Sequence, residues 1–296
     1  MKKSILIAIM LVLAVSCAKR EEKDSSIVFV SILPQRYFVQ RIVGDMYDVE
    51  VMVRPGHSPA TYEVLPAQMA RLSDARIYFR IGVPFEESWM DRIAEANPNM
   101  TIVDTREGVK LRKFNTFKDE PGHGHEDDHD SHDHAGTDPH IWLSPSAVKI
   151  QARTIFEEMA RLAPEHAEYY SQNLDSFLND LDKVHSRIES SLAELKNREI
   201  MVFHPAFGYF TDEFGLKQIP IEVAGKEPGP GTVRKMIDLA QKHDIRVIFV
   251  QKQFSTASAE AVAEGIGGTV VQIDPLAEAY LDNLENIAHS IRENVR

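Results

Sequence analysis

Three histidines and one aspartate of this chain lie in short motifs whose residue types suit the binding of a metal ion. They are His57 in RPGHSP, His140 in TDPHIWLS, His204 in FHPAFGYF and Asp274 in IDPL. Three imidazoles and one carboxylate can form a tetrahedral zinc site. A single loop histidine is usually an ordinary polar residue, and an Asp-Pro pair commonly starts a turn. The coincidence of four such positions favours a metal site.

Most of these residues follow directly after a segment that the sequence predicts to be a β-strand. His57, His204 and Asp274 come after residues 49–53, 199–203 and 269–273, which are rich in Val and Ile. In open α/β sheets, ligands bind at the carboxyl ends of the strands. The predicted strands therefore present three of the four candidates where a sheet of this class places its functional groups.

Composition narrows the chemistry further. The chain holds 33 Lys and Arg against 45 Asp and Glu, a formal net charge of -12, whereas nucleic-acid binding requires a basic surface. Its one cysteine, Cys17, excludes disulfides within the chain and all zinc or iron–sulfur sites built from cysteines. Histidines and carboxylates remain as metal ligands, and we expect no nucleic-acid partner.

Residues 119–134 (DEPGHGHEDDHDSHDH) are a second source of metal-binding groups. They hold seven acidic residues and five histidines: His123, His125, His129, His132 and His134. A segment without apolar residues other than proline cannot bury surface, so it is predicted to be a mobile loop. It is interpreted as a weak, multi-site zinc trap, and the alternative is an acidic loop that is merely solvated.

The same loop contains a literal match to the metalloprotease signature H-E-x-x-H, between His125 and His129. That chemistry needs a stable helix that places both histidines on one face and the glutamate as general base. Gly, Asp and His surround this copy, and no apolar residue would fix such a helix. We therefore reject the protease interpretation.

Predicted strands and helices alternate along the rest of the chain, which is typical of parallel sheets flanked by helices. The predicted strands are 27–32, 49–53, 76–81 and 101–103 in the first half, and 199–203, 217–221, 246–250 and 269–273 in the second. Predicted helices span 34–43, 205–214, 232–243, 256–265 and 277–294. The expected fold class is α/β, with two similar lobes that each contain one parallel sheet.

A long amphipathic helix is predicted between the lobes. Pro164 is expected to start it, and apolar residues then recur at steps of three and four: Tyr170, Leu174, Phe177, Leu181, Val184, Ile188, Leu192 and Leu195. A rod of this kind is about 45 Å long at 1.5 Å per residue. It is interpreted as a backbone helix that bridges both lobes, and a coiled-coil partner helix is the alternative.

The first residues read as an export signal. Lys2 and Lys3 precede an apolar run over 5–15, which is about half the length of a membrane span and ends in small residues before Cys17. A cysteine at this point resembles the lipoprotein signal, in which the thiol accepts a lipid, although Ala14 departs from the usual pattern. The predicted domains are a signal peptide (1–17), a tether (18–26), an N-terminal lobe (27–143), linking helices (144–198) and a C-terminal lobe (199–296).

Four motifs together carry a family resemblance. DPHIWLSP, FHPAFGYF, the QFS of residues 253–255 and IDPL resemble the solute-binding lipoproteins of bacterial zinc-uptake ABC transporters, the cluster A-I metal-binding family. The resemblance implies two α/β lobes with the metal between them, and it implies that His140 and His204 are ligands and that Asp274 occupies the fourth ligand position. It also implies Zn²⁺ rather than Mn²⁺, because manganese-binding relatives usually have Glu at His204. The implied partners are the permease subunits of an ABC transporter, and we expect an exported, lipid-anchored monomer, periplasmic or at the cell surface.

One motif departs from the family pattern Pro-Gly-x-x-Pro-His-x-Tyr-Glu. Ala60 occupies the ligand position, whereas the other positions match: Pro55, Gly56, Pro59, Tyr62 and Glu63. His57 lies three residues earlier, at most about 10 Å away along an extended chain. Either a tight turn points His57 into the same cleft, or His57 is exposed and water or Glu63 completes the metal shell. His57 is the preferred assignment.

Three functions compete at this stage. The leading hypothesis is a protein that binds zinc outside the cytoplasm and delivers it to a permease, without catalysis, because a site with four protein ligands leaves no coordination position for substrate. The alternative is a secreted zinc hydrolase in which Glu63 or Glu222 activates a metal-bound water. A third hypothesis is an adhesin on the same fold. Tight zinc binding without turnover of hydrolase substrates would support the first.

Overall fold

The structure is a computed structural model that describes residues 26–114, 136–222 and 227–295 of the 296-residue chain. The predicted signal peptide with Cys17, the predicted tether except for its last residue, and the His-rich segment 119–134 lie outside the described residues. None of the helices within the described ranges combines the length and the apolar composition that a membrane span needs.

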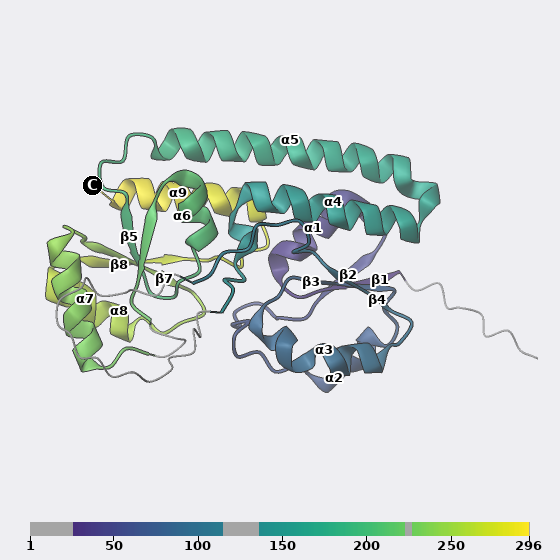
Figure 1. Cartoon of the computed structure of the whole chain (residues 1–296), viewed down its shortest axis with the longest axis horizontal. Helices are drawn as coiled ribbons and strands as arrows, with labels where there is room; N and C mark the ends of the chain where they lie inside the picture. The colour runs from purple at the N-terminus through teal and green to yellow at the C-terminus, as the bar shows by residue number, and fades with distance from the viewer. Residues whose placement is uncertain (1–25, 115–135, 223–226, 296) are drawn as a thin grey trace, which may run out of the picture.

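Two four-stranded parallel sheets form the two lobes, as the sequence predicts (Figure 1). The first has the order β2-β1-β3-β4, and its strands are β1 (Ile27–Val30), β2 (Asp48–Val51), β3 (Ile77–Arg80) and β4 (Thr101–Asp104). The second has the order β6-β5-β7-β8, with β5 (Glu199–Val202), β6 (Lys217–Pro220), β7 (Val247–Gln251) and β8 (Thr269–Ile273). In each sheet the strand order reverses next to the first strand of the lobe, β1 or β5. Ligands of such sheets bind at this reversal, beyond the carboxyl ends of the strands.

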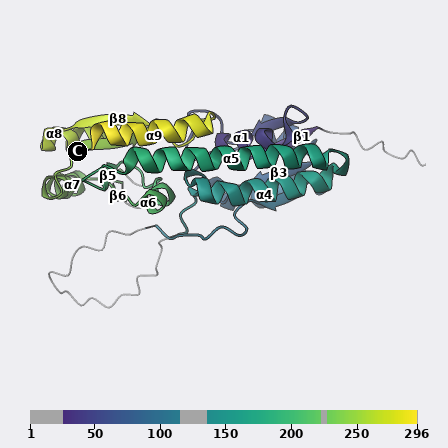
Figure 2. The same ribbon diagram turned by 90° about the horizontal axis from the view of Figure 1, so that it is seen from above.

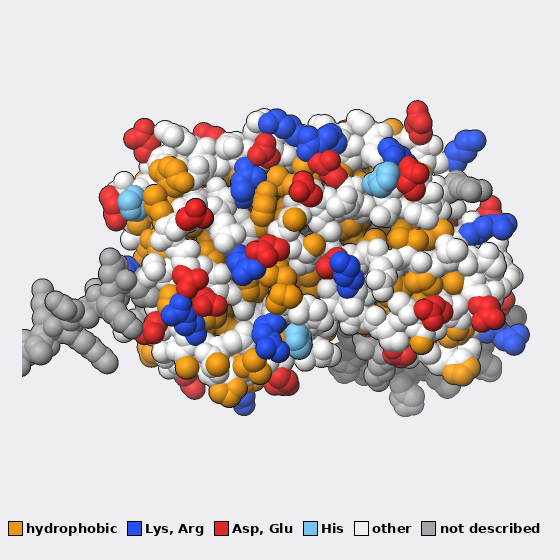
Figure 3. Space-filling model, turned by 180° about the vertical axis from the view of Figure 1, so that it is seen from behind, with side chains coloured by type: hydrophobic (Ala, Val, Ile, Leu, Met, Phe, Trp, Pro, Cys, Tyr) orange, Lys and Arg blue, Asp and Glu red, His pale blue; other side chains and the backbone are white. Residues whose placement is uncertain are grey.

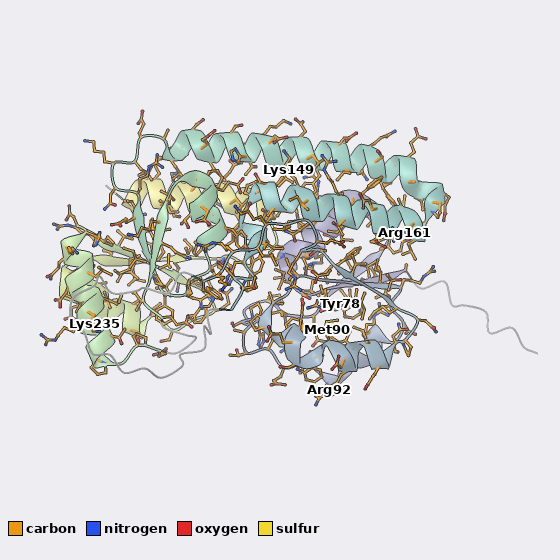
Figure 4. All side chains as sticks on the ribbon, in the orientation of Figure 1. Tyr78, Met90, Arg92, Lys149, Arg161 and Lys235 are labelled. Atoms are coloured by element: carbon orange, nitrogen blue, oxygen red, sulfur yellow. The ribbon has the colours of Figure 1, made fainter. Side chains whose placement is uncertain are left out.

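Helices cover both sheets, and two of them were not predicted. In the first lobe they are α1 (Leu33–Val43), α2 (Pro66–Leu72) and α3 (Pro84–Ala96), of which α2 and α3 are the unpredicted ones. The second lobe contains α6 (Gly208–Phe214), α7 (Pro230–Lys242), α8 (Ala257–Ile266) and α9 (Tyr280–Asn294). Figure 4 shows Arg92 of α3 and Lys235 of α7 near the outer edges of their lobes, away from the region where the lobes meet.

A pair of antiparallel helices joins the lobes. They are α4 (Pro145–Leu162) and α5 (Ala167–Leu192), separated by a 3₁₀ turn that begins at Pro164. The helix α5 is about 39 Å long at 1.5 Å per residue, somewhat shorter than predicted, because it ends before Leu195. It packs on α1 and α4 toward one end and on α9 toward the other end, as Figure 2 shows.

The predicted apolar stripe of α5 is buried from Tyr170 to Leu192. This stripe belongs to one continuous hydrophobic core that runs from the first sheet to α9, while a second core lies between the second sheet, α7 and α8. A single rigid helix with an apolar face therefore holds both lobes. In the view from behind (Figure 3), charged side chains of both signs are interspersed with apolar ones, as on an ordinary solvated surface.

A buried carboxylate fixes the end of β3 in the first lobe. Glu86 is fully buried and accepts hydrogen bonds from the Ser31 hydroxyl (2.5 Å) and from the backbone amides of Ile81 (2.9 Å) and Gly82 (2.8 Å). Tyr78, labelled inside the lobe in Figure 4, shares the Ser31 hydroxyl. This network holds the loop after β3 in one position, and that loop forms part of the wall of the site described next.

Candidate metal centre

His140 and His204 meet between the two lobes. His140 directly precedes the 3₁₀ turn Ile141–Leu143 that leads into α4, and His204 follows β5. Their ring centroids are 5.3 Å apart with planes at 71°, and both rings line one cavity of about 70 Å³. The structure thus brings together the two histidines that the sequence motifs and the family resemblance both single out.

The Nδ1 atom of each ring is hydrogen-bonded to a carboxylate. The His140 Nδ1 atom is 2.8 Å from Asp138 Oδ1, and the His204 Nδ1 atom is 2.6 Å from Glu222 Oε2. A neutral imidazole that donates through Nδ1 keeps its lone pair on Nε2, where it can bind a metal. Metal-binding histidines are commonly held by carboxylates in this way, so the pair has the hydrogen-bonding pattern of zinc ligands.

Asp138 is itself fixed by a buried ion pair. Its Oδ2 atom accepts from Arg112 Nη1 at 2.8 Å, and its Oδ1 atom also accepts from the backbone amide of His140 at 3.0 Å. The Arg112 Nε atom is 2.9 Å from Asp212 Oδ2. A fully buried carboxylate is tolerated only when it is paired, and here the pairing also aims Asp138 at His140.

Gly208 is expected to be necessary for this arrangement. A Cβ atom at Gly208 would overlap the Arg112 guanidinium and lie 2.5 Å from Asp138 Oδ2, so Gly208→Ala should displace the ion pair and weaken zinc binding about tenfold or more, the lower end of what outer partners contribute. Gly231→Ala is the matched control, because nothing lies within 4 Å of the added atom there. Zinc titrations of both variants measure the difference. Equal affinities would show that Arg112 does not act through Asp138.

The backbone and ring of His204 are held by residues of the second sheet. Gln251, at the end of β7, accepts from the His204 amide at 3.2 Å and donates to the His204 carbonyl at 2.7 Å. The ring stacks on Phe254 at 4.9 Å between centroids. Because Glu222 lies just after β6, the strand beside β5, the sheet itself places this carboxylate next to His204. The His204 ring is therefore preorganised.

Burial lowers the pKa of His140 below its usual value of about 6.5, and the hydrogen bond and charge of Asp138 oppose this shift without cancelling it. The neutral imidazole, which is the metal-binding form, therefore persists to lower pH than in an exposed histidine. The pairing with Asp138 orients the ring without protonating it at neutral pH.

Zinc affinity is expected to fall when the pH drops from 7.5 to 5.5, since a proton and a metal compete for the same imidazole lone pair. One imidazole with the ordinary pKa of about 6.5 would by itself cause a loss of about 10-fold over this interval. The lowered pKa of His140 should keep the contribution of His140 below that value. Competition titrations against a zinc indicator at both pH values test this, and an unchanged affinity would argue against imidazole ligands.

Asp274 lies beside the histidine pair rather than in its cavity. It lines a second cavity of about 290 Å³, which adjoins the first across Gln253 and Leu276. Its Oδ1 atom accepts from Gln253 Nε2 (3.0 Å) and from the Leu276 amide (2.9 Å), which is the turn expected of an Asp-Pro pair. Its Oδ2 atom lies 3.8 Å from Lys252 Nζ.

His57 lines the second cavity too, with its side chain exposed. Its amide donates to the Arg54 carbonyl at 3.1 Å, and this turn places its ring beside Arg54 and edge-on to Tyr62. Ala60, unlike His57, lines the cavity of the histidine pair. Glu63 is exposed and does not line that cavity. Among the described residues, no three His, Cys, Asp or Glu side chains are grouped closely enough to hold a metal ion. Of the four predicted ligands, His140 and His204 therefore line one cavity, and His57 and Asp274 line the other.

Sequence reasoning missed the residues that support the site. Asp138 stands two residues before His140, a spacing that could have suggested a local hydrogen bond, and Glu222 was considered only as a general base. The sequence around Arg112 does not indicate its role, because that role depends on a contact with Asp138, which lies 26 residues later in the chain. Trp142 was also missed. It closes the cavity wall by donating from Nε1 to the Pro275 carbonyl at 2.8 Å.

Known proteins share this architecture over almost the whole chain. The family described as "ZnuA: Zinc-uptake complex component A periplasmic" matches residues 28–294. A relative from Bacillus subtilis, the high-affinity zinc uptake system protein ZnuA, is 28% identical over 292 residues, which cover 92% of this chain and 87% of that protein.

Solved structures agree with the sequence matches. A crystal structure of ZnuA is 37% identical with a TM-score of 0.84, and the match covers 92% of this chain and 100% of that one. The laminin-binding protein of Streptococcus agalactiae, described as a bifunctional protein with adhesin and metal transporting activity, matches with a TM-score of 0.76 at 20% identity. The match covers 91% of this chain and 99% of that one. That likeness shows the fold alone.

Proposed function

This chain belongs to the zinc-uptake complex component A family, and from that premise we propose that it captures Zn²⁺ outside the cytoplasm and delivers it to the permease of an ABC transporter. The observation that carries the proposal is the facing pair of His140 and His204, each held by a carboxylate through Nδ1. Two nitrogen donors on a preorganised site favour Zn²⁺ over Mn²⁺, which prefers oxygen ligands.

The ligand set includes His140 and His204 in this proposal. Asp274 remains the proposed fourth ligand through its Oδ2 atom, since the turn already occupies Oδ1. A role for His57 would require residues 54–60 to turn inward, because its side chain faces the other cavity. The site lies where both lobes contribute walls, which is a position that ligand sites commonly occupy.

The protein acts by binding rather than catalysis in this proposal. The hydrolase alternative needs a carboxylate base beside a metal-bound water. Glu222 is occupied as the hydrogen-bond partner of His204, and Glu63 is exposed outside the cavity. Neither candidate base is placed to activate a water at the histidine pair. No contact among the described residues favours the adhesin hypothesis.

An exported protein is proposed, which the description of the matched family as a periplasmic component of a zinc-uptake complex supports, and permease subunits of an ABC transporter are its proposed partners. A lipid on Cys17 would keep the protein at the membrane surface, and it is proposed from the sequence motif alone. A monomer is proposed as well, because the long helix and the two lobes already form a continuous core within one chain.

The proposed function is tested by titrating metal-free protein with Zn²⁺ and by incubating the zinc-loaded protein with a panel of ester, peptide and phosphoester substrates. One tightly bound zinc per chain without turnover is the expected result. Turnover that depends on zinc would support the hydrolase instead, and the lack of any tight zinc would contradict both.

Deletion of residues 122–134 should leave one tight zinc per chain and remove additional weak sites. The deleted residues lie beyond the paired segments at Lys113 and Thr137, so the hydrogen bonds that hold Asp138 and His140 remain. The sequence predicts a mobile loop for these residues, and ordering such a loop would cost about 1–2 kcal/mol per residue of backbone entropy, which would keep its metal affinity low. Zinc stoichiometry by calorimetry measures both classes of site. Loss of the tight site would mean that the loop, rather than the histidine pair, holds the ion.

A further inference from the structure

The cavity beside His140 and His204 has an apolar wall where the family pattern has a histidine. Ala60 lines it at that position and offers no donor atom, and Ser58 beside it is engaged by the Ala60 amide (3.3 Å). Zinc in proteins is usually bound by four donors. His140, His204 and the proposed ligand Asp274 supply at most three, so the described residues provide fewer donors than a closed site requires.

The walls of this cavity favour a flat, neutral group. Apart from the two histidines, they are formed mainly by aromatic rings and prolines: Phe114, Trp142, Phe254, Pro59, Pro84, Pro139 and Pro275. Its volume of about 70 Å³ exceeds the roughly 10–15 Å³ that one water molecule needs on the same measure. A ring fits such walls better than a water molecule does, because it fills the space and buries apolar surface.

A carboxylate could also face the metal, but its second oxygen would then point at walls formed mainly by apolar groups. An imidazole that binds the metal through one nitrogen presents mostly carbon atoms to these walls, and only its remaining N–H needs an acceptor. The apolar walls therefore suit the ring better than the carboxylate.

We propose that this chain takes up zinc together with a small exogenous ligand that carries an imidazole ring, and that the ring supplies the nitrogen donor missing at Ala60. The proposal rests on the proposed function and defines its cargo more closely. Free histidine and imidazole carry the same ring and are the two sources that the experiment separates. Zinc is then held by His140, His204, Asp274 and one exogenous nitrogen, with no bond made or broken except those to the metal.

The experiment measures zinc affinity in a metal buffer that fixes the free Zn²⁺ concentration, so that chelation in solution does not contribute. L-histidine and imidazole should each tighten zinc binding to the parent protein by about tenfold or more, which corresponds to 1.4 kcal/mol. If L-histidine tightens zinc binding and imidazole does not, the protein also binds the amine and the carboxylate of histidine. Glycine, which chelates without a ring, should have no effect. Native mass spectrometry should detect a ternary complex of protein, zinc and histidine.

Ala60→His is the matched variant, because it restores a protein imidazole at an exposed position where the fold tolerates it. It should bind zinc tightly without any addition, and histidine should leave its affinity unchanged. The Co²⁺-loaded parent should change its visible spectrum on addition of histidine, and the variant should not.

Three results would overturn the inference. Tight zinc binding by the parent that histidine and imidazole leave unchanged would show that the chain and water complete the site, while the proposed function would stand. A similar effect of glycine would exclude recognition of the ring. Loss of affinity in His57→Ala would show that His57 supplies the missing nitrogen. Failure to bind zinc under every condition would instead remove the proposed function itself.

Discussion

His140→Ala and His204→Ala should each abolish tight zinc binding while the protein stays folded. The two rings supply the nitrogen donors that meet in one cavity, and neither variant leaves more than one of them. Loss of a direct ligand should exceed the roughly 10–100-fold that loss of an outer partner costs. Zinc competition titrations measure the affinity, and circular dichroism melting curves check the fold.

His243→Ala is the matched control for these two variants. His243 is also held through Nδ1 by a carboxylate, that of Glu199, but it lies at the C-terminal end of α7 and away from the cavity. We expect parental zinc affinity in this variant. If His140→Ala or His204→Ala bound zinc as tightly as His243→Ala, the site would have to lie elsewhere in the chain.

Glu222→Gln and Asp138→Asn should weaken zinc binding by about 10–100-fold without removing any direct ligand. The negative carboxylates fix the tautomer with the proton on Nδ1 and increase the electron donation of Nε2. An amide oxygen can still accept the hydrogen bond but carries no charge. Glu222→Gln is the cleaner change, because Asp138→Asn also leaves the buried Arg112 guanidinium beside a neutral group. Calorimetric titration of the purified variants gives the affinity ratio.

Glu199→Gln provides the control for this prediction. It makes the same change in the His243–Glu199 pair, which has equivalent chemistry at a place remote from the cavity. Zinc affinity should remain parental there. An equal loss in Glu199→Gln and Glu222→Gln would point to a general effect of charge or stability, and the role assigned to Glu222 would then be wrong.

The fold was largely predictable because its signals are local. Strands with alternating helices predict parallel sheets, and the spacing from Tyr170 to Leu192 predicts a long amphipathic helix. The helices α2 and α3 were missed. The former has seven residues of which Leu72 alone is buried, so it has little periodic apolar pattern, and both begin with a proline that also suggests a turn.

The site was only half predictable for a physical reason. His140 and His204 lie in motifs whose context is readable along the chain, and the structure brings them together. The partner of His204, Glu222, is close only because β6 pairs with β5, and this order is a property of the sheet. The direction of His57 depends on a turn of a few residues that is closed by the hydrogen bond from its amide to the Arg54 carbonyl, and the sequence left more than one direction of the ring open.

The central claim is that zinc binds between the lobes at the Nε2 atoms of His140 and His204. Anomalous diffraction at the zinc edge from crystals of the zinc-loaded protein tests it most directly. The account predicts one strong anomalous peak per chain, about 2.0–2.1 Å from both Nε2 atoms, with both Nδ1 atoms still bonded to Asp138 and Glu222. A peak away from this pair, or one that contacts Nδ1 instead, would contradict it.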